Sequence, residues 1–178
     1  MSLAPTHAFI HQTPTPTQDP QAIATHLEDL TKRLSIALTR PSDPENIALL
    51  HAHLANQICI GGTDQDDTHG LIPSASLITP EQYIAFAQAR KIAFPGWQLR
   101  VVDNLSTAVD PEDSRRAVVW LLTRSTVDEK VKQGRGGGRR WRENICKAFW
   151  RLQGVEGRWV WWKYEMMDGP AGGMCGDL

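Results

Sequence analysis

The chain has 178 residues, of which 41% are hydrophobic, enough for the core of one domain and too many for a disordered chain. A formal net charge of −1 excludes a strong overall field toward nucleic acid or anionic membranes. No apolar run approaches the roughly 20 residues that span a bilayer, which excludes a membrane-spanning helix. Three cysteines make an odd count without disulfide or zinc spacing, so we expect a reducing, cytoplasmic location.

Both ends of the chain are predicted to lack fixed structure. Proline and threonine are frequent in residues 1–18, and glycine in residues 169–178. The first 20 residues also lack the basic and apolar regions of a secretory signal. We therefore expect a disordered tail at 1–18, one folded domain at 19–168 and a flexible tail at 169–178.

Three helices are predicted in the first half of the domain. Each begins with an N-cap residue followed by proline: Asp19-Pro20, Asp43-Pro44 and Thr79-Pro80. Apolar residues at steps of three and four form one stripe along the first helix: Ile23, Leu27, Leu30, Leu34 and Leu38. The second helix is expected to carry Ile47, Leu50 and Leu54, and the third to run to about Phe94, before Pro95-Gly96.

Strands are predicted after Gly96, where the apolar period changes from 3.6 to two. We expect them at residues 97–106, 117–126, 141–152 and 158–167, with two shorter strands between residues 57 and 78. Helices followed by a meander of long antiparallel strands indicate an α+β fold.

Several stretches resemble the SnoaL-like branch of the nuclear transport factor 2-like superfamily. The stretches that carry the resemblance are a helix opening at Thr79-Pro80-Glu81, then Phe94–Asp103, Ala117–Arg124, and the closing strands around Phe149–Leu152 and Gly157-Arg158-Trp159. It covers roughly residues 20–168. The turn at Gln153–Gly157 departs from the family's Asp-Gly-Lys turn. The Pro/Thr tail and the tryptophan-rich last strand are similar to small fungal members of natural-product pathways.

The resemblance implies a cone, in which a curved antiparallel sheet wraps a cavity that the N-terminal helices close. It also implies a homodimer through the outer sheet face. The family includes isomerases, dehydratases and cyclases that need no cofactor, and members that only bind a ligand. Fold alone therefore does not decide the function. The main hypothesis is a cyclase, isomerase or dehydratase acting on a hydrophobic natural-product intermediate.

The last two strands carry candidate cavity residues. Alternation along the last strand places Lys163 on one face and both Trp162 and Tyr164 on the other, which we expect to point inward because charges prefer water. Tyr164 lies where some relatives carry a catalytic carboxylate, and a tyrosine there can donate a proton. On the preceding strand one face holds candidates for carbonyl polarisation or substrate contact: Asn144, Cys146 and Trp150.

The inward face of the strand at 117–126 is not decided by its sequence. Trp120 and Arg124 belong to one set and Thr123 to the other. If Arg124 faces inward it needs a carboxylate partner, because an unpaired buried charge costs several kcal/mol, roughly. Asp103 on the preceding strand is the candidate for that role.

Two further residues are candidates near the mouth of the predicted cavity. His69 follows an aspartate-rich turn and is expected to act as an acid or base near neutral pH. Tyr83 on the third helix is expected to reach the substrate. His51 and His53 lie two apart on a helix and do not share a face, so we expect no metal site there, and no organic cofactor.

Two alternatives to an enzyme remain open. A non-catalytic ligand-binding or dimeric assembly protein would have no acid–base pair in its cavity. Nucleic-acid binding is disfavoured by the net charge, although six basic residues and no acid fall between Lys130 and Arg142 around three glycines.

Overall fold

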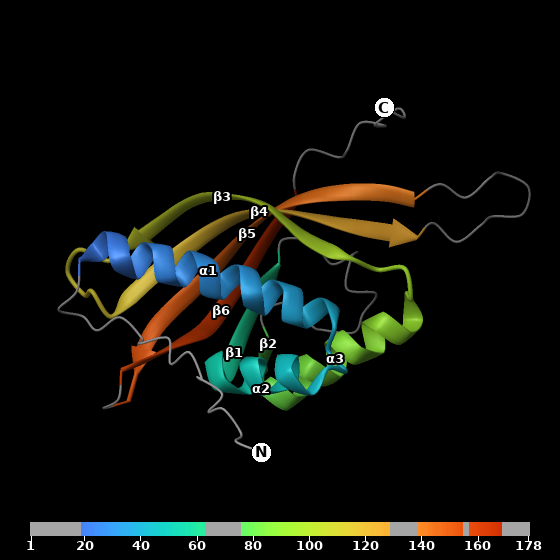
Figure 1. Cartoon of the computed structure of the whole chain (residues 1–178), viewed down its shortest axis with the longest axis horizontal. Coiled ribbons are helices and arrows are strands. Elements are labelled where there is room, and N and C mark those ends of the chain that lie inside the picture. The colour runs from blue at the N-terminus through green and yellow to red at the C-terminus, as the bar shows by residue number, and fades with distance from the viewer. Residues whose placement is uncertain (1–18, 63–75, 129–138, 155–156, 169–178) are drawn as a thin grey trace, which may run out of the picture.

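The computed structural model describes residues 19–62, 76–128, 139–154 and 157–168. In that part of the chain, three helices cover one face of a curved, unclosed sheet of six strands (Figure 1). This confirms the predicted α+β cone. The tails predicted at 1–18 and 169–178 lie outside the described residues.

The helices begin where the sequence predicts. They are α1 (Pro20–Thr39), α2 (Pro44–His53) and α3 (Pro80–Ala93). At α3 the Thr79 hydroxyl accepts from the Gln82 amide, and the Gln82 side chain accepts from the Thr79 amide. Leu54 was expected on the second helix, but its extended backbone ends α2 and begins the first strand. None of the described helices is both long and apolar enough to cross a membrane.

The sheet has the order β2-β1-β6-β5-β4-β3. Its strands are β1 (Leu54–Gly62), β2 (Ser76–Ile78), β3 (Leu99–Val109), β4 (Arg116–Asp128), β5 (Arg139–Gln153) and β6 (Arg158–Asp168). The four later strands form the predicted antiparallel meander. One pairing differs, because β1 runs parallel to β6. Parallel neighbours require a long connection, and α3 with β3, β4 and β5 supplies it here.

A β-bulge interrupts β6. Phe149 pairs with Lys163 but Trp150 pairs with Trp161, so Trp162 is an extra residue on this strand. A bulge of one residue reverses the alternation of faces beyond it. Trp161 before the bulge and Tyr164 after it therefore both face the helices. Trp162 lies on the outer face of the sheet, where its ring meets Phe149 edge-on at 6.1 Å.

Side chains of α1 attach it to the sheet through polar contacts as well as apolar packing. Glu28 accepts hydrogen bonds from Asn104 (3.1 Å) and Thr107 (2.7 Å) on β3. Deeper in the core, the Trp150 indole donates to the Thr31 hydroxyl at 3.1 Å. These contacts hold α1 across the concave face of the sheet and leave space near its C-terminal end.

Candidate functional site

An inner cavity of about 110 Å³ lies between the helices and the concave face of the sheet. All elements except α2 and β2 contribute side chains to its wall. Most of the wall is apolar. Its polar and aromatic members include Ser35, Tyr83, Thr123, Asn144, Trp161 and Tyr164. The volume is below the roughly 300–1,000 Å³ of common ligand pockets, so only a compact molecule or the head of a larger one fits.

A neutral hydrogen-bonded cluster lies at one side of this cavity. The Tyr164 hydroxyl donates to Cys146 Sγ at 2.8 Å, and Thr123 Oγ1 lies 3.3 Å from the same sulfur. The Thr123 hydroxyl is also 3.3 Å from the backbone carbonyl of Asn144. The Tyr164 ring is fixed by an edge contact with Trp161 at 5.4 Å. The cluster joins β4, β5 and β6 through side chains that carry no charge.

Burial keeps the cluster protonated. It raises the pKa of Tyr164 well above its ordinary value, and the neighbouring Cys146 acts in the same direction. Burial also raises the pKa of the Cys146 thiol, while the hydrogen bonds from Thr123 and Tyr164 oppose that shift. The pKa of Tyr83 is raised too, again mainly by burial. Near neutral pH these groups act as hydrogen-bond and proton donors, not as bases.

Two buried polar atoms in the cavity wall have no hydrogen-bond partner among the described residues. They are Oδ1 of Asn144 and Nε1 of Trp97. Arg90 also lines the cavity, and its guanidinium lies over the Trp97 ring, 4.6 Å from the ring centroid. Arg90 therefore gives the Trp97 side of the cavity a positive potential.

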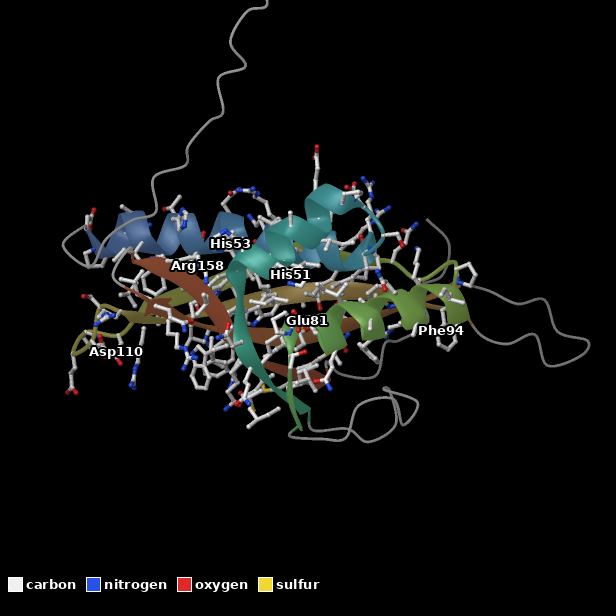
Figure 2. All side chains as sticks on the ribbon, turned by 90° about the horizontal axis from the view of Figure 1, so that it is seen from below. His51, His53, Glu81, Phe94, Asp110 and Arg158 are labelled. Carbon is white, nitrogen blue, oxygen red and sulfur yellow. The ribbon has the colours of Figure 1, made fainter. Side chains whose placement is uncertain are left out.

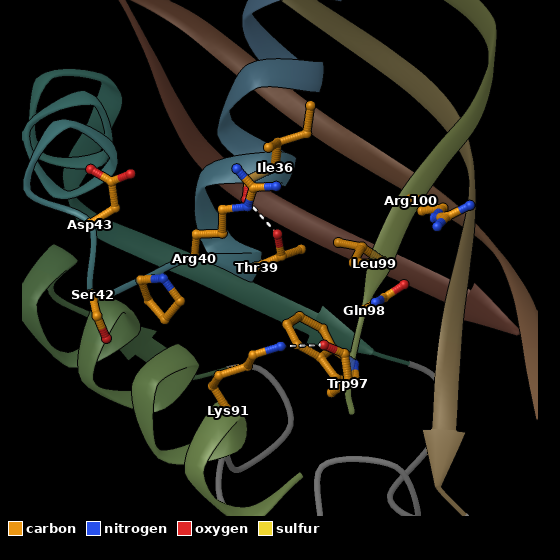
Figure 3. Close-up of a pocket in the computed structure, with 11 residues that line it drawn as sticks. Ile36, Thr39, Arg40, Ser42, Asp43, Lys91, Trp97, Gln98, Leu99 and Arg100 are labelled. Atoms are coloured by element: carbon orange, nitrogen blue, oxygen red, sulfur yellow. Dashed lines mark hydrogen bonds between the residues drawn. The ribbon is translucent and has the colours of Figure 1, made fainter. Parts of the chain in front are cut away.

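A larger outer pocket of about 570 Å³ opens beside the cavity, where α1, α2, α3 and β3 approach one another (Figure 3). Trp97 and Leu99 line both spaces and so form the partition between them. Lys91 holds this partition in place by donating to the Trp97 backbone carbonyl at 2.8 Å, as Figure 3 shows.

The sequence-predicted site residues fall into separate groups. Tyr164, Asn144 and Tyr83 line the inner cavity, and Cys146 lies directly behind Tyr164. Trp150 is completely buried against α1 and does not line the cavity. His69 lies outside the described residues, and its predicted role stays a prediction.

Other predicted residues lie on the outer face of the sheet. Trp162 points outward because of the bulge, contrary to the expected alternation. Trp120 also lies there, with Lys147 Nζ 4.2 Å from its ring centroid. The inward face of β4 instead carries Leu121 and Thr123, both almost completely buried.

The expected pairing of Arg124 with Asp103 is wrong. Arg124 forms an ion pair with Glu143, the residue directly opposite it on β5, with 3.1 Å between Nε and the carboxylate. Asp103 is exposed and pairs in register with Leu122. Both side chains of the ion pair are partly exposed, so solvent and a cross-strand neighbour satisfy the charge of Arg124, and no buried carboxylate partner is needed.

Among the cavity residues that were not singled out from the sequence are Thr123, Arg90 and Trp97. For Thr123, the sequence showed which residues of β4 share a face, but not which of the two faces points toward the cavity. Arg90 and Trp97 flank the turn that ends α3. Trp97 belongs to the Phe94–Asp103 stretch, but nothing in that stretch indicates that its side chain reaches the cavity. Only the path of the chain through that turn brings them to the cavity.

The described residues include no group of three or more His, Cys, Asp or Glu side chains arranged to hold a metal ion. Figure 2 shows His51 and His53 on α2. His51 Nδ1 lies 3.7 Å from Glu81 on α3, whereas His53 Nδ1 lies 3.1 Å from the Trp159 carbonyl on β6. The two histidines therefore point to different neighbours, as their spacing predicted.

Comparison with known proteins finds similarity in structure only. No family model matches the sequence, and no curated protein matches it. Among solved structures, a nuclear transport factor 2-like superfamily protein from Salmonella enterica has 9% identity and a TM-score of 0.61, over 90% of this chain and 100% of that chain.

Two further solved structures extend the comparison. A CaMKII hub from S. rosetta has 9% identity and a TM-score of 0.56, covering 82% of this chain and 96% of that one. A ketosteroid isomerase-like protein from Erwinia carotovora atroseptica has 14% identity and a TM-score of 0.51, covering 83% and 97%. At these identities the comparison shows the fold: the chain has the nuclear transport factor 2-like architecture.

Proposed function

We propose that the protein is a cofactor-independent isomerase or lyase acting on a small hydrophobic carbonyl compound, as in natural-product pathways. The observation that carries the proposal is the neutral donor cluster in an otherwise apolar cavity, in which Tyr164 donates to Cys146 beside Thr123. The likeness to a ketosteroid isomerase-like protein is consistent with this reading.

The cluster supports proton donation to a substrate oxygen. The Tyr164 hydroxyl can rotate from Cys146 Sγ toward an oxygen in the cavity, and its raised pKa keeps it protonated. In a β-hydroxyketone, loss of the α-proton and of the hydroxyl gives a conjugated enone and water. Tyr164 would supply the proton that leaves with the hydroxyl. Because the surrounding wall is largely apolar, competing solvent is excluded from that hydrogen bond.

The base for the α-proton is the second part of the proposal. None of the described side chains in the cavity wall is a carboxylate or an imidazole. We assign this role to His69, because an imidazole side chain can accept a proton near neutral pH.

The experiment uses 3-hydroxycyclohexanone in D₂O, with NMR detection of deuterium at the α-carbons and of cyclohexenone formation. We expect the protein to accelerate both, and Tyr164→Phe to lower the rate by about 10²–10⁴-fold. Trp120→Phe, on the outer face, is the matched aromatic control and should leave the rate unchanged. If the wild-type protein leaves both rates at the level of buffer alone, the proposed function is wrong.

A second candidate is a ligand-binding protein without catalysis, which would hold the same compound in the cavity without transferring its protons. This candidate predicts that 3-hydroxycyclohexanone shifts the NMR signals of Asn144 and Tyr164 while its protons do not exchange. The same NMR experiment therefore distinguishes the two candidates.

We also propose that two copies associate through the outer sheet face. Three aromatic residues lie on this face, Trp120, Phe149 and Trp162. A lysine or arginine lies over each ring, at 4.2, 4.9 and 5.8 Å from the ring centroids respectively. Aromatic residues and arginine are enriched at protein interfaces, and this face carries three aromatic rings and Arg151.

A further inference from the structure

The two unpartnered polar atoms of the inner cavity differ in kind. Nε1 of Trp97 is a donor and Oδ1 of Asn144 is an acceptor, and neither meets a protein partner in the part of the chain that the structure describes. Trp97 is 7% exposed and Asn144 3% exposed. Leaving a buried polar group unpaired costs about 1–3 kcal/mol, so such groups indicate a place where something else binds.

Both residues line the inner cavity, as does Tyr83 on α3. Leu99, two residues after Trp97, pairs with Ser125 on β4, and Thr123, two residues before Ser125, pairs with Asn144 on β5. Trp97, just before β3, and Asn144 on β5 therefore flank the same stretch of β4.

The surroundings of each atom indicate which ligand group it takes. The guanidinium of Arg90 lies over the Trp97 ring and makes this side of the cavity favourable for an oxygen with partial negative charge, such as a carbonyl oxygen. Asn144 is a neighbour of the cluster, because the Thr123 hydroxyl donates to its backbone carbonyl. Its side-chain acceptor, Oδ1, needs a donor such as a hydroxyl.

We propose that the inner cavity selects a compact ligand, or ligand head, that carries both a carbonyl and a hydroxyl, with Trp97 Nε1 donating to the carbonyl and Asn144 Oδ1 accepting from the hydroxyl. This rests on the proposed function, because it names the substrate class of the same cavity. It makes Trp97 a specificity-determining residue. It also places the hydroxyl beside Tyr164, the proton donor for its departure.

The cavity volume agrees with this class. About 110 Å³ suits a ring of a few carbon atoms with two oxygen substituents, and excludes a polycyclic body. A longer substrate would have to extend past the Trp97 and Leu99 partition toward the outer pocket. Recognition at the inner cavity then depends on the two oxygens rather than on the rest of the molecule.

The test compares the binding of 3-hydroxycyclohexanone, cyclohexanone and cyclohexanol to the full chain by NMR titration. We expect the compound with both groups to bind at least tenfold more tightly than either of the others. Trp97→Phe should reduce the advantage conferred by the carbonyl, and Asn144→Leu the advantage conferred by the hydroxyl. Trp120→Phe is the control for loss of an indole and should retain both preferences.

A measurement on the unaltered protein guards against variants that fold poorly. The indole N–H proton of Trp97 should move downfield with 3-hydroxycyclohexanone and with cyclohexanone, but not with cyclohexanol, because only a carbonyl is placed at this donor. Equal affinities for the three compounds, or an indole signal that does not respond to the ketones, would overturn the inference.

The outcomes separate this inference from the proposed function. If the hydroxyketone reacts but binds without the stated preferences, the substrate class is wrong and the enzymatic proposal stands. Selective binding without reaction supports the inference and contradicts catalysis. If none of the three compounds binds, both fail.

Discussion

At the scale of single residues, one buried hydrogen bond decides how α1 sits on the sheet. Thr31 accepts from the Trp150 indole while its own hydroxyl donates to the Leu27 carbonyl at 2.6 Å. Thr31→Val keeps the shape but leaves the indole N–H without a partner. We expect the free energy of unfolding to fall by about 1–3 kcal/mol, measured by urea denaturation.

A double-mutant cycle isolates this bond from other effects of the substitution. In a Trp150→Phe background there is no N–H to leave unpaired, so Thr31→Val should cost clearly less than it does alone. Additive costs in the double variant would show that the bond does not contribute in the way described.

His53 gives the fold a pH dependence. Burial lowers the pKa of His53 below the ordinary 6.5, and Arg158 and Arg33 act in the same direction, while its hydrogen bond to the Trp159 carbonyl opposes them. The unfolded chain therefore binds the proton more readily than the folded one. The stabilising contribution is complete above pH 6.5 and is lost as the pH falls through the lower, folded-state pKa.

We expect the unfolding free energy to decrease between pH 7.5 and 5 (roughly), and His53→Asn to remove part of that decrease, because an amide can donate to Trp159 without titrating. His51→Gln is the matched control, since His51 is on the same helix but beside Glu81 and largely exposed. An unchanged pH profile in His53→Asn would contradict the assignment.

At the scale of secondary-structure elements, the bulge on β6 determines which residues reach the cavity. If Trp162 took part in regular pairing, strict alternation from Trp161 would carry Lys163 inward and Tyr164 outward. Deleting Trp162 removes only the extra residue, so Lys163 should stay outward and Tyr164 inward, and a cooperative thermal transition should remain. Inserting one alanine between Lys163 and Tyr164 turns Tyr164 outward and should abolish stable folding. Circular dichroism distinguishes the two, and an insertion variant as stable as the deletion variant would refute the register argument.

The bulge also marks the limit of what the sequence predicts. Local signals identified the three helix starts, because an N-cap residue and a proline act within a few residues of each other. The strands and the α+β class followed from period alone. Tyr164, Asn144 and Tyr83 were placed correctly in the cavity.

What the sequence did not predict depends on partners far along the chain. Trp162 was assigned inward because nothing local marks a bulge, which only the pairing with β5 creates. The orientation of Arg124 was left open, and Asp103 was named as its partner if it faced inward, because the cross-strand neighbour Glu143 is known only from the register. Trp97 was missed as a cavity residue because its position depends on the turn after α3.

At the scale of the whole molecule, the proposed dimer predicts a concentration-dependent mass. The outer face combines its aromatic rings with ion pairs, since Lys147 and Lys163 both contact Glu165. A specific interface buries about 800 Å² on each copy, so association through this face has to cover its aromatic rings. Trp162→Glu removes one of these rings and adds a charge that association would desolvate in both copies.

Sedimentation velocity is therefore expected to show a dimer for the wild-type protein and a monomer for Trp162→Glu. Ile92→Glu supplies the matched control, because Ile92 is 81% exposed on α3, away from the outer sheet face. It should leave the dimer intact. A wild-type monomer at micromolar concentration would contradict the proposed dimer. Dissociation by Ile92→Glu but not by Trp162→Glu would show that the interface lies elsewhere. The inner cavity faces the helices on the opposite side of the sheet, so ligand binding should survive in the Trp162→Glu monomer.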